Sequence, residues 1–329
     1  MEKVSHRKLA DAVSDGYRID MQTALMLHAT PDQDILGLLT GANKIRSRFK
    51  ANKVSLCSII NAKSGRCPED CAFCSQSAHH KTNISTFPLL SEDQIADAFK
   101  RSSAYPIERF GLVISGKGLT ADNETEAVCA AIHKLRKSAD GTMVCASLGV
   151  LSREVAAKLK EAGLQSYHHN VETSRAFFPR ICSTHSYDER INTARIAKEF
   201  GFKLCCGGIF GLGENAEDRM DMAMLLRELD VDSVPLNFLV PAPGTRLAGQ
   251  TALKPLEILK IIALFRYILP EKDIRVCGGR ETNLRDLQGL VFSAGANGIM
   301  LGNYLTTTGR PPEKDLKLLS DLGLEPALS

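Results

Sequence analysis

The chain of 329 residues contains no tryptophan, and aromatic residues make up only 6% of it. A long apolar run is missing as well. The longest candidate, residues 258–269, is interrupted by Lys260 and Arg266 and is shorter than the about 20 residues that a membrane-spanning helix needs. The chain begins Met-Glu-Lys-Val-Ser-His-Arg, without the apolar core of a secretory signal. We therefore expect a cytoplasmic protein without a membrane span.

A strong charge of one sign is also absent. Lysine and arginine together number 41 and aspartate and glutamate 38, which gives a net charge of +3 at pH 7. Such a balance offers little attraction to nucleic acid or to a membrane surface. The hydrophobic fraction of 44% and the charged fraction of 24% are ordinary for a globular protein. The length suits either two modest domains or one large α/β barrel with extensions.

Cysteine, in contrast, is abundant, with ten residues. Disulfides would need an oxidising compartment, and no export signal supports one. Cysteines can also bind metals, serve as reactive thiols or fill small buried apolar positions. The spacing of the cysteines and their positions in the fold must distinguish these roles.

Short β-rich runs alternate with amphipathic helical patterns from about residue 54 onward. The eight β-rich runs span residues 54–61, 109–116, 142–149, 166–172, 203–211, 233–240, 273–280 and 296–305. The seven helical patterns span residues 91–104, 124–138, 152–163, 187–201, 216–229, 256–269 and 283–294. Alternating strands and helices form parallel β/α units, and eight strands close a barrel. We predict an α/β protein with a TIM-type (βα)8 barrel, in preference to an open doubly wound sheet.

The chain outside this alternation is expected to add helices at the N-terminal side of the barrel. Residues 5–14, 21–27 and 33–49 have helical patterns. We expect one domain over residues 1–329, with N-terminal helices over 1–50, the barrel over 51–310 and a C-terminal tail over 311–329. In such barrels the chemistry takes place at the C-terminal ends of the strands.

Three cysteines follow the first predicted strand, at this catalytic end of the barrel. Cys67, Cys71 and Cys74 have the spacing CxxxCxxC. Three thiolates so close in sequence can bind one metal centre, and sulfur ligands favour zinc or an iron–sulfur cluster. Structural zinc needs four protein ligands, and no second CxxC pair is present to complete them. Three ligands leave one iron of a 4Fe–4S cluster open to a substrate or cofactor, so the spacing favours the cluster.

The spacing, with Phe73 before the last cysteine, resembles the signature of the radical S-adenosylmethionine superfamily. Longer motifs resemble the biotin synthase family within it. These motifs are GRCPEDC at residues 65–71, YHHNVETS at 167–174, GGIFGLGE at 207–214, SVPLNFLV at 233–240 and GRE at 279–281. They occur in order over nearly the whole chain, from about residue 30 to residue 325.

The resemblance implies a sulfurtransferase that converts dethiobiotin to biotin. In this family a 4Fe–4S cluster and S-adenosylmethionine generate a radical that abstracts hydrogen from C9 and then C6 of dethiobiotin, and sulfur is inserted. It also implies a flavodoxin- or ferredoxin-type reductant, iron–sulfur assembly machinery and a homodimer. Nucleic acid and membranes are not expected as partners.

The resemblance also assigns roles to single residues. Cys67, Cys71 and Cys74 are expected to bind the catalytic cluster. The residues expected to contact S-adenosylmethionine are Phe73, Asn170, Glu172, Arg190, Gly207, Ile209 and Gly211. Asn170 and Asn237 are expected to bind dethiobiotin. Arg190, which neighbours acidic residues on a predicted helix, could equally be a solvated surface residue.

A second cluster of this family is expected deeper in the barrel, where the sequence departs from the usual pattern. Biotin synthases commonly hold a 2Fe–2S cluster there with three cysteines and an arginine. Gly111 occupies the position of the second-strand cysteine, whereas Cys145, Cys205 and Arg275 are present.

A compensating ligand is available two residues after the arginine. Side chains alternate along a strand, so Cys277 points to the same side as Arg275. We expect Cys145, Cys205 and Cys277 to hold an auxiliary iron–sulfur cluster, with four irons and an extra sulfide rather than a 2Fe–2S core. Arg275 is expected near the cluster or ligating it. If Cys277 is only an apolar filler, the second cluster is absent or degraded.

The remaining cysteines are expected to be structural, including Cys57, Cys129 and Cys182, although Cys57 on the first strand could face either the barrel interior or the helices. Two alternative functions stay open at this point. One is another radical enzyme of the same branch that inserts no sulfur, which the loss of the second-strand cysteine would favour. The other is an iron–sulfur binding protein without catalytic activity.

Overall fold

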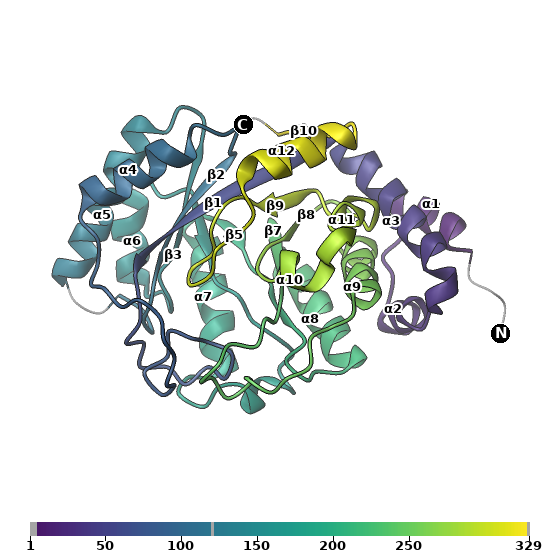
Figure 1. Ribbon diagram of the computed structural model, residues 1–329, viewed down its shortest axis with the longest axis horizontal. Coiled ribbons are helices and arrows are strands. Elements are labelled where there is room, and N and C mark those ends of the chain that lie inside the picture. The colour runs from purple at the N-terminus through teal and green to yellow at the C-terminus, as the bar shows by residue number, and fades with distance from the viewer. Residues whose placement is uncertain (1–4, 120–121, 328–329) are drawn as a thin grey trace.

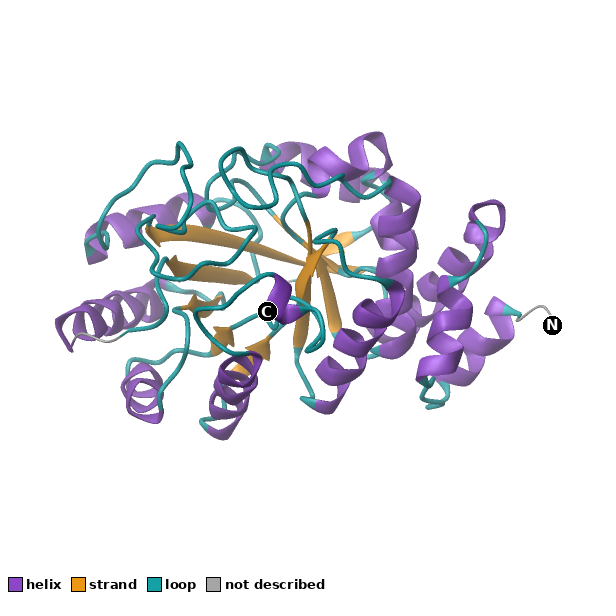
Figure 2. Cartoon of the chain, turned by 90° about the horizontal axis from the view of Figure 1, so that it is seen from below, coloured by secondary structure: helices purple, strands orange, loops and turns teal. Residues whose placement is uncertain are grey.

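A closed barrel of parallel strands forms the centre of the computed structural model, which describes residues 5–119 and 122–327 (Figures 1 and 2). The strands are β1 (Lys53–Lys63), β2 (Arg109–Ile114), β3 (Met143–Ser147), β4 (Ser166–His168), β5 (Lys203–Cys205), β6 (Gly208–Phe210), β7 (Ser233–Phe238), β8 (Asp273–Val276) and β9 (Gly298–Met300). Each pairs in parallel with its neighbours, and the pairing of β1 with β9 closes the barrel. The predicted (βα)8 barrel is confirmed.

One predicted strand, residues 203–211, is divided into β5 and β6. Both halves pair with β7, so the barrel keeps its order at this point. The interruption lies at Cys206 and Gly207, where the Gly207 N–H donates to the side-chain oxygen of Asn170 at 3.1 Å. A side chain of the neighbouring segment thus replaces a strand carbonyl as the acceptor.

Helices on the outer surface cover the barrel, as Figure 2 shows. They are α4 (Glu92–Ser102), α5 (Asp122–Ser138), α6 (Arg153–Glu161), α7 (Tyr187–Glu199), α8 (Ala216–Glu228) and α9 (Pro255–Ile268). Ser91, Ser186 and Asn215 begin three of them with reciprocal capping boxes, which satisfy backbone N–H groups of the first turn. None of the described helices is long and apolar enough to cross a membrane.

The last predicted helix, residues 283–294, is broken. It forms α10 (Arg280–Leu284), a 3-10 turn (Arg285–Leu287) and α11 (Leu290–Ser293). Arg285 has a φ of +51°, which a regular helix cannot accommodate. The periodic apolar pattern therefore continues through a backbone that changes direction.

Further elements lie outside the barrel at both ends of the chain. Helices α1 (His6–Ser14), α2 (Met21–His28) and α3 (Ile35–Lys50) form a group beside α9 (Figure 1). Residues in the segment expected as a C-terminal tail form α12 (Pro312–Asp321) and the short strand β10 (Glu325–Pro326), which pairs with the start of β1.

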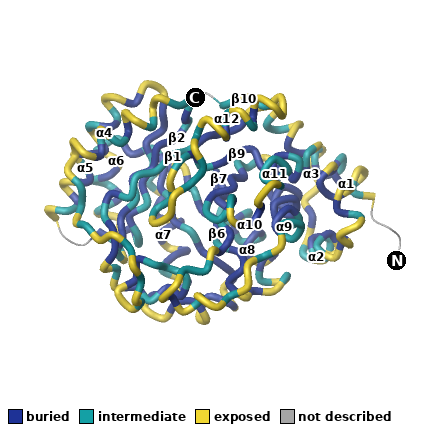
Figure 3. Tube along the Cα trace, in the orientation of Figure 1, coloured by how far each residue is buried: buried dark blue, intermediate teal, exposed yellow. Residues whose placement is uncertain are grey.

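Helix α9 is enclosed between the barrel and α3, and every residue from Ile261 to Ile268 is buried (Figure 3). The enclosed set includes Arg266, whose side chain is 0% exposed. Its guanidinium donates to the carbonyl oxygens of Gly295, Pro270 and Lys272 at 2.8 Å each and to Asn297 Oδ1 at 2.7 Å. Burial lowers the pKa of Arg266 to about 9. This one side chain satisfies the carbonyl groups of the loop between α9 and β8.

Substitution Arg266→Ala should therefore destabilise the fold strongly. It leaves several buried carbonyl oxygens without a donor and opens a cavity, so we expect a loss of about 3 kcal/mol or more in the free energy of unfolding of the metal-free chain in urea. Lys317→Ala, which removes an exposed pair with Asp321 on α12, is the control and should cost less than about 0.5 kcal/mol. Equal effects of the two substitutions would contradict this role of Arg266.

Candidate active site and metal centres

A cavity of about 460 Å³ opens at the C-terminal ends of the strands and continues into the barrel. The cysteines of the CxxxCxxC loop line it, and so do thiols from the interior of the strands. Within the described residues all ten cysteines are free thiols. Two groups of possible metal ligands therefore share one enclosed space.

The loop that carries Cys67, Cys71 and Cys74 leaves β1 through a bulge and is fixed by backbone hydrogen bonds. The pairing of β1 with β2 shifts between Asn61 and Lys63, and such bulges re-aim the chain. Cys67 N–H donates to the Gln76 carbonyl at 3.0 Å, and Cys74 N–H donates to the Cys71 carbonyl at 2.9 Å. Phe73 also lines the cavity. The three thiols thus reach the cavity from one ordered turn.

A second segment, residues 181–185, fastens this loop from the side. Ala72 N–H donates to the Ile181 carbonyl at 2.7 Å. The Asp70 carboxylate accepts from the Ser183 N–H at 2.9 Å and from the Ser183 hydroxyl at 2.6 Å. Burial would raise the pKa of Asp70, but the hydrogen bonds from Ser183 hold it well below its usual range. Ionised Asp70 therefore ties the two segments together.

The polar wall of the cavity is formed by Asn170, Glu172 and Arg190. Asn170 Nδ2 donates to Glu172 Oε2 at 3.3 Å, and Arg190 Nη1 donates to the Asn170 carbonyl at 2.8 Å and lies 3.6 Å from Glu172 Oε1. Glu172 has a φ of +71°, a left-handed conformation that is unusual for a residue with a side chain. Residues 170 and 172 do face one space, but through this turn and not through strand alternation, because β4 ends at His168.

Arg190 is buried and not solvated, at 7% exposure. It lies on α7, with its guanidinium 5.4 Å from the ring centre of Phe178. Its Nε has no hydrogen-bond partner within the described part of the chain, and the same holds for Nε2 of His169, which also lines the cavity. Unpaired buried donors are costly, so these atoms are suited to an incoming polar ligand.

The glycine-rich segment has a packing role in addition to any contact with a ligand. A Cβ at Gly207 would lie 2.1 Å from the Pro235 carbonyl oxygen, so only glycine fits between the strands there. Gly211 has a φ of +89°, which favours glycine. Ile209 is part of the cavity lining, whereas Gly207 and Gly211 are not.

Asn237 lies on β7 and lines the same cavity. Its Nδ2 donates to the Gly208 carbonyl at 3.2 Å, and its Oδ1 accepts from the Gly278 N–H at 2.9 Å. The side chain is thereby held in one orientation between β6 and β8. One N–H of its amide is left for a ligand.

Four thiols converge inside the barrel, one more than the sequence predicts. Cys145 and Cys205, expected from the family resemblance, line the cavity together with Cys277, expected from strand alternation, and Cys206 does not. Cys57, which we expected to be structural, also points inward and forms a side-chain hydrogen bond with Cys277. Of the two directions open to Cys57, the structure shows the one toward the barrel interior.

Burial and hydrogen bonding set the acidity of these interior thiols. Burial raises the pKa of Cys145 to about 11 and also raises that of Cys205. The hydrogen bond from Cys277 lowers the pKa of Cys57 to about 6 and raises that of Cys277 itself. One thiolate is thus favoured in the metal-free site, and a bound cation would favour the others.

Two arginines lie below these thiols, at the floor of the cavity. Arg275 Nε donates to Ser233 Oγ at 2.8 Å, and its Nη2 lies 3.4 Å from Asp273 Oδ2. Arg109 Nη2 lies 3.1 Å from the same oxygen. Burial opposes the charge of Arg275, but Cys57 and Asp273 raise its pKa. Arg275 therefore keeps its charge. The two arginines are balanced by Asp273 and by Glu108, whose oxygens lie 3.3 Å from Arg109 Nε and 3.9 Å from Arg275 Nη2.

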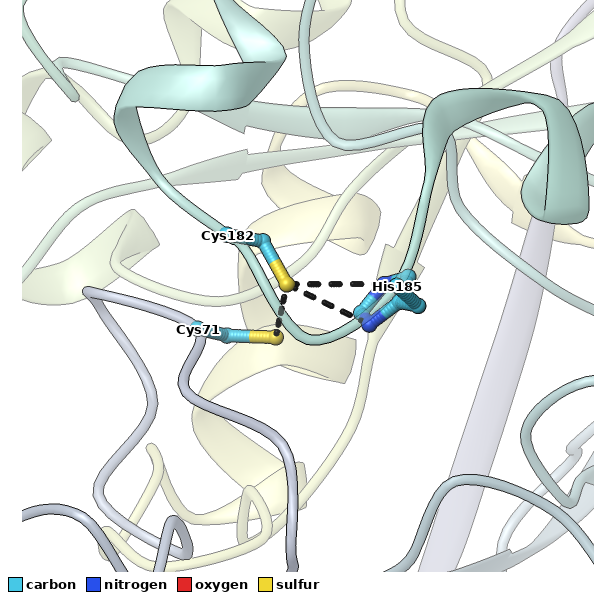
Figure 4. Close-up of side chains that lie close together, drawn as sticks. All are labelled: Cys71, Cys182 and His185. Atoms are coloured by element: carbon cyan, nitrogen blue, oxygen red, sulfur yellow. Dashed lines mark hydrogen bonds between the residues drawn. The ribbon is translucent and has the colours of Figure 1, made fainter.

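A further group of ligand-type side chains adjoins the loop and has no sequence signal. Cys182 Sγ lies 3.9 Å from Cys71 Sγ and 3.2 Å from His185 Nδ1 (Figure 4). The latter contact is local in sequence, but 111 residues separate the two cysteines. No pattern along the chain indicates that they meet.

Comparisons with known proteins agree with the geometry. Residues 62–226 match the Radical SAM superfamily, and residues 235–325 match the Biotin and Thiamin Synthesis associated domain. The biotin synthase of Geobacter metallireducens is 52% identical over 316 residues, which are 96% of either chain. That of Geotalea daltonii is 49% identical over 99% of this chain and 98% of its own.

The fold also occurs in more distant solved structures. Methylornithine synthase superposes with a TM-score of 0.85 at 22% identity and covers 97% of each chain. A maturase of the [FeFe]-hydrogenase superposes with a TM-score of 0.83 at 16% identity, over 99% of this chain and 76% of its own. These two similarities concern the fold alone.

Asp70→Ala should loosen the cysteine loop without unfolding the barrel. It removes the acceptor for Ser183 and for the Thr184 N–H, so amide exchange should rise in residues 67–78 and 181–186. Hydrogen–deuterium exchange with mass spectrometry measures both segments, and Asp70→Asn, which keeps one acceptor oxygen, should have a smaller effect. Unchanged exchange in both segments of Asp70→Ala would show that the loop is held by other contacts.

Proposed function

Because the chain belongs to the biotin synthase family of radical S-adenosylmethionine enzymes, we propose that its cavity divides one reaction between two iron–sulfur centres. The chain is a sulfurtransferase that converts dethiobiotin to biotin. A 4Fe–4S cluster and S-adenosylmethionine supply the radical that abstracts hydrogen, and an auxiliary cluster supplies the sulfur. The observation that carries the proposal is the presence of two separate groups of thiols in one cavity.

The first centre belongs to Cys67, Cys71 and Cys74. Three thiolates leave one iron of a cubane cluster without a protein ligand, which is where S-adenosylmethionine binds in this superfamily. Arg190 would pair with the carboxylate of the cofactor through its fixed planar donors. Glu172 and Asn170 would form hydrogen bonds with the nucleoside. Phe73 and Ile209 would pack against it. Gly207 and Gly211 would allow the backbone to approach the nucleoside closely.

The substrate would lie between the two centres. Asn237 is held by backbone groups on both sides, so its remaining N–H has a fixed direction toward the cavity. Asn170 reaches the same space from the segment after β4. We assign both amides to the ureido ring of dethiobiotin, because an amide matches the donors and acceptors of that ring.

The second centre would be held by Cys145, Cys205 and Cys277. Gly111 offers no ligand, and the inward direction of Cys277 provides the third thiolate. We propose four irons with an extra sulfide rather than a 2Fe–2S core, because the ligand set has moved across the barrel. Arg275, bound to Ser233 and Asp273, would compensate the negative charge of the cluster from below. Cys57 would be an additional thiol beside the Cys277 ligand.

Other parts of the proposal come from the family. The electron would come from a flavodoxin- or ferredoxin-type protein, and assembly machinery would supply the clusters. The chain would act as a homodimer in the cytoplasm. Nucleic acid and membranes would have no part in the reaction.

Iron analysis of the anaerobically reconstituted protein should separate the two centres. We expect about eight irons per chain, four for each cluster. Replacing Cys67, Cys71 and Cys74 together by Ala should leave about four, and replacing Cys145, Cys205 and Cys277 together should also leave about four. A total near six, with about two lost in the second variant, would favour the 2Fe–2S alternative.

Product analysis should separate radical formation from sulfur insertion. The variant without Cys145, Cys205 and Cys277 should still form 5′-deoxyadenosine from S-adenosylmethionine under reducing conditions but should form no biotin. The variant without the loop cysteines should form neither product. If the wild-type chain, fully loaded, formed deoxyadenosine and no biotin, sulfur insertion would be disproved.

A further inference from the structure

Three possible metal ligands meet at the edge of the cysteine loop, and one of them, Cys71, is also proposed to bind the catalytic cluster. They are Cys71 from the loop and Cys182 and His185 from the segment after the 3-10 turn Phe178–Arg180, and the Glu69 carboxylate lies against His185. All four residues are buried, each with 9% exposure or less. The ligand atoms of Cys71, Cys182 and His185 lie within 4.8 Å of one another.

The distances in this group resemble those of a tetrahedral metal site. A metal with bonds of about 2.3 Å to sulfur and about 2.0 Å to nitrogen separates two sulfurs by about 3.8 Å and sulfur from nitrogen by about 3.5 Å. Cys71 Sγ and Cys182 Sγ are 3.9 Å apart, and Cys182 Sγ and His185 Nδ1 are 3.2 Å apart. The side chains in Figure 4 point toward one common space.

The surroundings of His185 also favour a cation. Its Nδ1 faces both Cys182 Sγ and the Glu69 carboxylate oxygen Oε2, with which it is in close contact. One ring nitrogen carries at most one proton for these two acceptors. A divalent cation bound by Cys71, Cys182 and His185 would take the place of that proton and would be balanced by the nearby Glu69 carboxylate, and the sulfur and nitrogen ligands select zinc or ferrous iron over magnesium or calcium.

The segments that carry these ligands are already joined before a metal binds. Thr184 Oγ1 donates to Glu69 Oε2 at 2.8 Å, and Asp70 binds the backbone N–H groups of Ser183 and Thr184. Arg246 donates to the carbonyls of Asp70 and Ile181 at 2.9 and 3.0 Å. Metal binding would therefore need to order little of these two segments.

We propose that Cys71, Cys182 and His185, with the Glu69 carboxylate beside them, form a mononuclear site for a divalent zinc or ferrous ion in the chain without its catalytic cluster. Cys71 cannot serve this ion and the cluster together. The ion must therefore leave before the cluster is inserted, and zinc bound here delays insertion. The competition rests on the proposed role of Cys71 in the cluster, whereas the ion site itself does not.

Cobalt(II) is a suitable probe for the ion site, since thiolate ligation gives charge-transfer absorption and a tetrahedral site gives intense visible bands. The cluster-free full chain is titrated anaerobically with Co²⁺ in a background carrying Cys67→Ala and Cys74→Ala, which keeps Cys71. Adding Cys182→Ser should weaken the binding of one Co²⁺ by more than about tenfold and reduce its thiolate bands to those of the one remaining thiolate, Cys71. Contributions of the interior thiols are the same in both chains and cancel in the difference.

A second variant guards against misfolding of the first. His185→Gln should weaken the binding of the same Co²⁺ ion. At saturation it should keep the charge-transfer bands of two thiolates. Cys129→Ser, which changes a thiol on α5, is the matched control and should leave the titration unchanged. Co²⁺ binding that is indifferent to both Cys182→Ser and His185→Gln would overturn the site.

Competition is tested by cluster reconstitution after addition of one equivalent of Zn²⁺. Loading of the loop cluster, followed by iron content and by the EPR signal of the reduced protein, should fall severalfold in the wild-type chain and less in Cys182→Ser. Zinc that binds but leaves loading unchanged would refute the competition. A chain that loads no loop cluster even without zinc would instead contradict the proposed function, and the cobalt result would still decide the ion site.

Discussion

The floor of the barrel depends on the largely buried carboxylate of Asp273, which joins three separate elements. It contacts Arg109 on β2, Arg275 on β8 and Lys50 at the end of α3. Burial would raise its pKa, but Arg275 and Lys50 hold the pKa well below the usual range. Removing one partner of such an enclosed group is strongly destabilising, so these charges depend on one another.

This arrangement connects stability to function. The arginines that hold Asp273 also form the floor beneath the four interior thiols. A site for a sulfide-rich centre needs fixed positive charge, and here that charge is part of the barrel's own ion network. The polar side chains of Asn170, Arg190 and Asn237 line the same cavity, and so do the cysteines of the loop.

Much of this could be predicted from the sequence because the relevant signals are local. Alternating β-rich and helical patterns are enough to predict the barrel, and three closely spaced cysteines are enough to predict the loop. Alternation along a strand places Arg275 and Cys277 on one side, and the structure agrees. The family relation excludes the alternative of a protein that only binds metal.

Other features could not be predicted, for physical reasons. Both faces of β1 carry apolar side chains, so alternation does not indicate whether Cys57 points into the barrel or toward the helices. The left-handed turn at Glu172 has no sequence signal, because glycine is absent there. The meeting of Cys71 and Cys182 depends on the packing of two loops. Arg190 is buried by α7 although its immediate neighbours in sequence are acidic.

Strand β1 carries Cys57 near its beginning and passes at its end into the loop with Cys67. Each residue of a strand adds about 3.3 Å and reverses the direction of the side chain. The length of β1 therefore sets the distance between Cys57 and the cysteine loop. Point substitutions elsewhere leave that spacing unchanged, whereas a single-residue insertion or deletion in β1 would alter both the separation and the side on which Cys57 lies.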